Sequence, residues 1–110
     1  MSEHHRYLDC ILSCSSCANA CERCVTLSLR EDDLALHAHC MRLARDCADI
    51  CRLSAVFMLR ESEHAPALCR LCKDVCLACA DECVQHASHH CQECARTCQV
   101  CADACAALFA

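Results

Sequence analysis

The sequence predicts an all-α protein, an up-down-up-down antiparallel four-helix bundle with a cysteine-lined core. Three observations support this prediction. The 110 residues include no glycine and one proline, which leaves little material for tight turns or hairpins. Eighteen residues are cysteines, mostly spaced three or four apart, and this spacing keeps thiols on one stripe of an α-helix. A chain of this length forms one domain, 1–110, with room for about four helices of ~20 to 25 residues.

Four segments of the chain carry these cysteine stripes. The stripes contain Cys10, Cys14, Cys17, Cys21 and Cys24; Cys40, Cys47 and Cys51; Cys69, Cys72, Cys76, Cys79 and Cys83; and Cys91, Cys94, Cys98, Cys101 and Cys105. The third and fourth stripes match through all five cysteines at one fixed offset. A repeat of one helix with one thiol stripe is typical of a bundle, and short connections make neighbouring helices antiparallel.

The first two helices are expected over residues 3–29 and 33–61. Ser2 is a good N-cap for the first helix, because its hydroxyl can accept a backbone N–H that lacks a partner within the helix. Asp32 or Asp33 can cap the second in the same way, and an acidic first turn suits the positive end of the helix dipole.

The last two helices are expected over residues 66–87 and 89–108. Pro66 fits the first position of the third helix, where its missing N–H would have no partner anyway. Ser88 is the predicted N-cap of the fourth helix. The connection between these two helices must therefore be very short.

The cysteines are expected to be free thiols, although a short cysteine-rich chain often signals a disulfide scaffold. The first residues show no apolar segment and no cleavage site of an export signal, which favours the reducing cytoplasm. Cysteines three or four apart on a helix have Cβ atoms ~5 to 6 Å apart, whereas a disulfide needs ~3.5 to 4.5 Å. Neighbours on one stripe therefore cannot pair without bending the helix.

Charge and hydropathy exclude two classes of partner. The net charge is −5, and Lys and Arg are scattered among Asp and Glu, so we expect no nucleic-acid surface. No apolar run approaches the ~20 residues of a membrane span, so we expect no membrane partner.

With all four stripes turned inward, the bundle core becomes a column of thiols. Reactivity rather than packing usually decides where cysteine is kept, so a metal-binding core is favoured over ordinary buried cysteines. Soft thiolates favour Cu(I), Zn(II) and iron–sulfur clusters. When Cu(I) replaces a thiol proton the charge is unchanged, whereas a zinc ion with four thiolates leaves two excess negative charges in a low-dielectric core. This comparison favours multiple Cu(I) ions.

The repeated Cys-x-x-x-Cys and Cys-x-x-Cys spacing on four predicted helices resembles the bacterial copper storage proteins, specifically their cytosolic branch. The resemblance extends from Cys10 to Cys105. It implies a homotetramer of four-helix bundles in which all 18 cysteines bind many Cu(I) ions through their thiolates. It also implies copper storage, sequestration and detoxification without catalysis, with a copper chaperone or cuproenzyme as a further partner. Three alternatives stay open: a zinc-binding protein, an iron–sulfur protein and a helical copper sensor.

The predicted threading makes one end of the bundle polar and the other apolar. The second stripe extends through His37, Ala44, Ser54 and Met58, and the third extends to His86. We expect Cu(I) to be taken up at the end with His37 and His86, with Met41 as a transient soft ligand. The opposite end is expected to be closed by Tyr7, Met58 and Leu108. Ala44 and Ser54 occupy stripe positions without a thiol, so copper density beside them is expected to be lower.

The remaining motifs are assigned to the surface or to packing. His4, His5, His64, His89 and His90 fall off the stripes, which predicts solvated side chains. Glu61 and His64 form a lone Glu-x-x-His, whereas a di-iron bundle needs two such motifs and two further glutamates. A second line on helix 33–61 contains Leu36, Leu43, Ile50 and Phe57, with Leu53 beside it. We expect part of this line to complete the core, and Phe57 with Leu53 to form a subunit interface.

Overall fold

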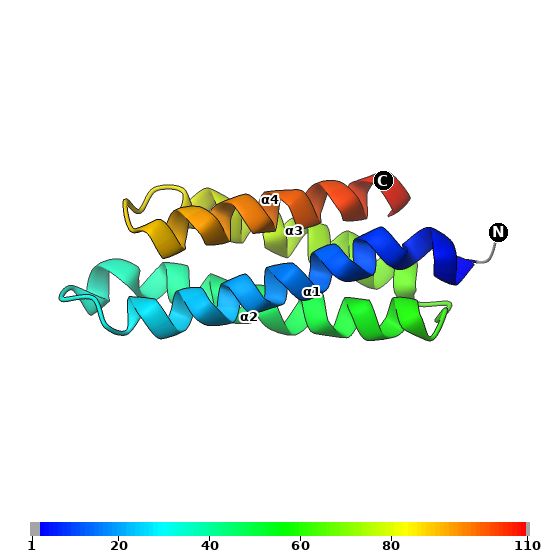
Figure 1. The fold of residues 1–110 in the computed structure, drawn as a ribbon, viewed down its shortest axis with the longest axis horizontal. Helices are drawn as coiled ribbons and strands as arrows, with labels where there is room; N and C mark the ends of the chain where they lie inside the picture. The colour runs from blue at the N-terminus through cyan, green and yellow to red at the C-terminus, as the bar shows by residue number, and fades with distance from the viewer. Residues whose placement is uncertain (1–2, 110) are drawn as a thin grey trace.

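The protein is an elongated bundle of four antiparallel helices (Figure 1). The computed structural model describes residues 3–109, with side chains from Tyr7 onward, so the predicted cap Ser2 and the His4 and His5 side chains lie outside the described part. The helices are α1 (Glu3–Ser28), α2 (Leu34–Leu59), α3 (Ala65–Cys83) and α4 (His89–Phe109). The helix α1 packs against α2 and α4, and α3 packs against the same two. The predicted all-α, up-down-up-down bundle is confirmed, with extents of 49 × 19 × 18 Å.

The helix ends follow the capping residues, with two differences from the prediction. The Asp33 carboxylate accepts the backbone N–H of Leu36 at 3.1 Å and caps α2. The Ser88 hydroxyl instead donates to Glu31 at 2.8 Å, so it ties together the two connections at this end of the bundle. The α-helix α3 ends at Cys83, short of the predicted residue 87, because the chain tightens there: the N–H of His86 donates to the carbonyl of Cys83 at 3.1 Å.

The end of α2 reverses the chain without a glycine. Glu61 has φ 53°, in the left-handed region that glycine usually occupies. The N–H of Ser62 donates to the carbonyl of Phe57 and the N–H of Glu61 to that of Met58, both at 3.0 Å, which is the Schellman pattern. These bonds satisfy two carbonyls at the helix end and turn the chain into α3.

The core consists of cysteine and alanine with few large side chains. All 18 cysteines are buried, each at 1% exposure or less. Of the predicted second line on α2, Leu43, Ile50 and Phe57 pack partly buried against this core, whereas Leu36 is exposed. Leu53 is also exposed. Leu43 and Ile50 thus help to complete the core, as expected for part of this line.

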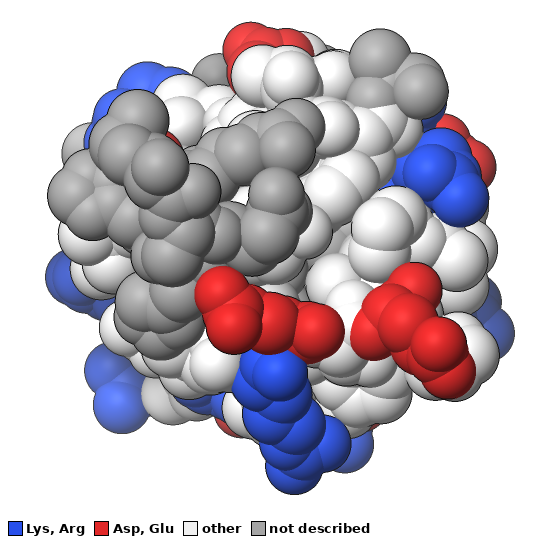
Figure 2. Space-filling view, turned by 90° about the vertical axis from the view of Figure 1, so that its right-hand side faces the viewer, with Lys and Arg blue, Asp and Glu red and all other residues white. Residues whose placement is uncertain are grey.

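The end of the bundle that carries both chain termini is closed by apolar side chains. The ring centroids of Tyr7 and Phe109 lie 5.5 Å apart, and the Met58 side chain is fully buried. Leu108, the predicted closing residue, is only partly buried, because the last turn of α4 directs Phe109 onto the core instead. Figure 2 shows this end: acidic and basic side chains are scattered around its edge, with uncharged surface between them. None of the described helices combines the length and the hydropathy of a membrane-spanning segment.

Candidate metal centre

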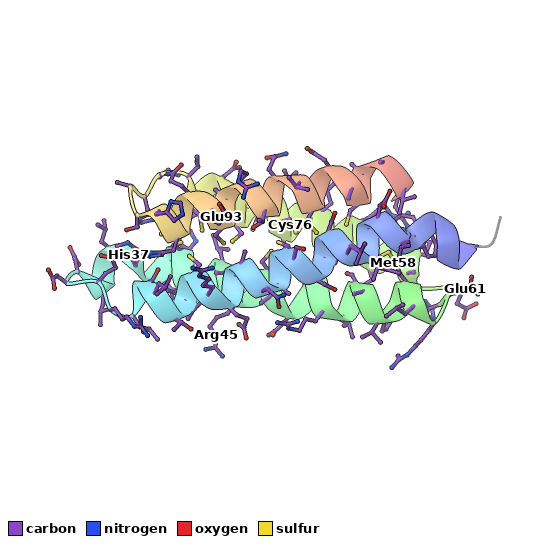
Figure 3. All side chains as sticks on the ribbon, viewed as in Figure 1. His37, Arg45, Met58, Glu61, Cys76 and Glu93 are labelled. Carbon is purple, nitrogen blue, oxygen red and sulfur yellow. The ribbon has the colours of Figure 1, made fainter. Side chains whose placement is uncertain are left out.

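The buried sulfurs form one continuous column along the bundle axis (Figure 3). Contacts between helices group the sulfurs into layers, because the antiparallel register brings one stripe position from each helix to the same level. In the middle layer, for example, the Cys47 sulfur lies 3.7 Å from that of Cys17 and 3.5 Å from that of Cys76. The Cys17 sulfur lies 3.6 Å from that of Cys98 on α4. We call all 18 sulfurs together the thiol column.

Five layers account for every cysteine in the chain. From the closed end they are the end layer (Cys10, Ser54, Cys69, Cys105), a second layer (Cys14, Cys51, Cys72, Cys101), the middle layer (Cys17, Cys47, Cys76, Cys98), a fourth layer (Cys21, Ala44, Cys79, Cys94) and the outer layer (Cys24, Cys40, Cys83, Cys91). Each layer has one position on each helix. Ala44 and Ser54, both fully buried, are the two positions without a thiol.

The sulfurs are shared between neighbouring groups of ligands. Sets of four sulfurs lie within 4.8 Å of one another, and Cys51 belongs both to the second layer's set and to a set with Cys17, Cys76 and Cys101. The Cys51 sulfur lies 3.7 Å from those of Cys72 and Cys76, in two adjacent layers. All 18 cysteines are free thiols, as predicted. A thiolate placed this way can bridge metal ions in successive layers, so the column offers a ladder of ligands rather than separate cages.

Hydrogen bonds and burial lower the pKa of some thiols in the column and raise the pKa of others. In the outer layer, hydrogen bonds from Cys24 and then Cys83 lower the pKa of Cys40 from 9.0 to about 3. Burial, with the nearby Cys40 charge, raises the pKa of Cys91 to about 11. In the end layer, hydrogen bonds from Cys105 and Cys14 lower the pKa of Cys10 to about 4. Each of the five layers contains at least one thiol with a lowered pKa. Every layer thus offers a sulfur that holds its proton weakly.

At the end of the thiol column opposite the closed end, three imidazoles lie over the outer layer. The rings of His37 and His86 lie 4.9 Å apart, and His90 lies 6.5 Å from His37, measured between ring centroids. His37 precedes Cys40 by three residues on α2, and His86 follows Cys83 by three, so the imidazole pair lies one turn outside the outer layer. We call His37, His86 and His90 the histidine mouth. The prediction that His90 is a solvated surface residue was wrong, because its side chain is 14% exposed.

Two of the three imidazoles of the histidine mouth, those of His37 and His86, each have one ring nitrogen beside an oxygen acceptor. His37 Nδ1 lies 3.2 Å from the carbonyl oxygen of Asp33, and His86 Nε2 lies 2.8 Å from Glu82 Oε2. The other oxygen of Glu82 lies 3.2 Å from His39 Nδ1. When one imidazole nitrogen donates to an oxygen, the second nitrogen keeps its lone pair and can ligate a metal. This arrangement suits His37 Nε2 and His86 Nδ1 to receive an ion.

His90 and Glu82 were not identified from the sequence, whereas Met41, His64 and His89 lie at the surface. His90 lies one position before the cysteine stripe of α4, so only the tight connection after α3 turns it toward His37. Met41 is partly exposed beside Cys40, and His64 and His89 are exposed. A carboxylate four residues before His86 was the available signal for Glu82.

Comparison with known proteins gives one consistent result. A family model described as copper storage protein matches residues 3–110. The uncharacterized cysteine-rich protein YhjQ of Bacillus subtilis is 42% identical over 66 residues, which cover 60% of this chain and 61% of that protein, so the match spans less than two thirds of its length.

Two solved structures resemble the whole bundle. The Cu(I)-bound copper storage protein BsCsp3 of Bacillus subtilis is 40% identical, with a TM-score of 0.91 over 94% of this chain and 98% of that one. A cytosolic copper storage protein from Streptomyces lividans, with five coppers, is 34% identical, with a TM-score of 0.93 over 97% of this chain and 94% of that one.

Proposed function

Because the chain belongs to the copper storage protein family, we propose that it stores many Cu(I) ions as thiolate complexes along the thiol column. The observation that carries this proposal is the sharing of sulfurs between adjacent layers, as at Cys51. Bridging thiolates allow about one Cu(I) for each sulfur, so a filled column stays close to neutral although it is buried. The 18 cysteines are the proposed ligands, and the cytoplasm is the proposed compartment.

Storage by this design needs no catalytic step. The thiol column is buried along its length, and the closed end is covered by Tyr7, Met58 and Phe109. Cuprous ions inside are therefore kept from water and oxidants. A copper chaperone or a cuproenzyme is the proposed exchange partner.

Charge, colour and ion count separate the alternatives from copper storage. Isolated zinc sites would accumulate two negative charges per ion in the same dry column, and iron–sulfur cubanes need four ligands that converge, normally from loops. Cu(I) has a filled d shell, so the loaded storage protein is expected to be colourless with many ions per chain. A brown product would identify an iron protein, and saturation at about one ion would identify a sensor.

The histidine mouth is the proposed site of copper uptake. Replacing His37 and His86 with Phe is expected to slow Cu(I) loading on the order of tenfold, because the ion loses its first nitrogen ligands. The final copper count should stay the same, since the thiol column is intact. Stopped-flow loading under anaerobic conditions measures this. His64→Phe, an exposed histidine at the opposite end, is the control; unchanged loading in the double variant would contradict the uptake role.

We also propose that the chain forms a homotetramer with Leu53 and Phe57 in a subunit interface. Leu53 is exposed on α2, and Phe57 is only partly buried beside it. Replacing both with Glu should lower the mass measured by light scattering, because two charges would have to be desolvated in the interface. Val100→Glu, an exposed residue on the diagonally opposite helix, serves as the control. An unchanged oligomer in a correctly folded double variant would remove this interface.

A further inference from the structure

Ser54 is a buried polar residue whose hydroxyl has no hydrogen-bond partner in the part of the chain that the structure describes. Its side chain is fully buried, and its hydroxyl finds no partner among the described residues. Helical hydroxyls usually bond to the carbonyl of the preceding turn, as Thr26 does to Glu22 at 3.1 Å and Thr97 does to Glu93 at 3.2 Å. Such an unsatisfied group is destabilising, and alanine would fill the same position without that cost. Ala44, the other stripe position without a thiol, shows that the column accepts alanine.

Along the bundle axis, Ser54 lies between the sulfurs of the second layer and the apolar side chains of the closed end. Ser54 lies one turn beyond Cys51, as Cys69 lies one turn before Cys72, and the sulfurs of Cys51 and Cys72 are 3.7 Å apart. This register places Ser54 level with Cys69. The sulfurs of Cys10 and Cys105 in the same layer are 3.6 Å apart.

The end layer has the least charge compensation when copper is bound. Interior thiolates have a layer on each side and can bridge ions in both directions, whereas end-layer thiolates have a neighbouring layer on one side only. Beyond them lie Met58 and the rings of Tyr7 and Phe109, which bring no charge. A thiolate there keeps more of its negative charge, and a hydroxyl donor would stabilise it because hydrogen bonds to charged acceptors are the strong ones.

We infer that Ser54 donates a hydrogen bond to an end-layer thiolate in the copper-loaded protein, and that it thereby strengthens the binding of the innermost Cu(I). This inference rests on the proposed storage function. The acceptor is the sulfur of Cys10, Cys69 or Cys105. The fold already holds a related contact at the other end of the column, where the Ser28 hydroxyl lies 3.9 Å from the Cys24 sulfur. Ser54 acts here as a positioning residue.

Ser54→Ala tests the inference, because two readouts should move in opposite directions. Without copper, the variant should unfold at a higher temperature than the natural protein, since the unsatisfied hydroxyl is gone. When loaded, it should release its last-retained ions to a competing chelator about tenfold more readily, as expected for the loss of one hydrogen bond to a charged group. If loaded Ser54→Ala keeps its copper as well as the natural protein does, the inference is overturned.

Ser54→Cys gives an independent check of where position 54 faces. A thiolate there completes the end layer and should raise the copper capacity by about one ion. An unchanged capacity would place position 54 away from the ions and would also overturn the inference. Failure of the proposed function has a different signature, because the natural protein itself would then bind few Cu(I) ions.

Discussion

Replacing the four cysteines of the middle layer with alanine is expected to lower Cu(I) capacity by roughly four ions or more, at about one ion per thiolate. The loss should exceed the sulfur removed, because these sulfurs join the layers on either side. The Cys98 sulfur, for example, lies 3.7 Å from that of Cys21 in the next layer. Anaerobic titration with Cu(I), followed by copper analysis of the isolated protein, measures the effect.

The matched control removes sulfur from the end of the column instead. Alanine at Cys10, Cys69 and Cys105 shortens the thiol column without dividing it, so capacity should fall only in proportion to the sulfur lost. Each buried substitution leaves a small void worth about 1 kcal/mol, so circular dichroism should establish that both variants are folded. Equal loss per sulfur in the two variants would mean that the thiols bind copper independently.

Copper loading at neutral pH is expected to release protons from the thiols that still hold them, at most one per Cu(I), and the affinity should fall as the pH falls. The sign follows from the thiols with raised pKa. Cys91, at about 11, keeps its proton through the neutral range, so copper must displace it. Because hydrogen bonds from Cys24 and Cys83 lower the pKa of Cys40, protons compete with copper for this sulfur only at lower pH. Affinity should therefore decline throughout the range below pH 7.

Two measurements test this dependence. Proton release during loading can be followed with a pH indicator in weak buffer, and copper retention can be followed against a chelator whose own pH dependence is known. For each proton that copper displaces, lowering the pH by one unit should weaken copper binding about tenfold. Copper affinity that is constant between pH 8 and pH 5 would show that the column binds copper without losing protons.

The four helices and the buried thiols could be predicted because local spacing decides them. A stripe of cysteines three and four residues apart has one face, and only the core can bury that face on four helices at once. The same spacing placed His37 and His86 together at one end. These features depend on periodicity and antiparallel order, which the sequence contains.

The missed features depend on how the helices end. The prediction extended α3 to residue 87, but the chain tightens after Cys83 and brings His90 toward His37. At the other end, the last turn of α4 directs Phe109 rather than Leu108 against Tyr7. The role of Glu82 as partner of His86 and His39 depends on the approach of α2 and α3. Helix ends are the least determined part of a periodic pattern.

Sulfurs shared along one axis should hold monovalent ions at near parity. Anaerobic titration of the reduced, metal-free protein with Cu(I) against a competing chelator measures this ratio. Tight binding should continue until the copper count approaches the 18 thiols of the chain. Saturation at about one or two ions per chain, with most thiols still reactive, would contradict it.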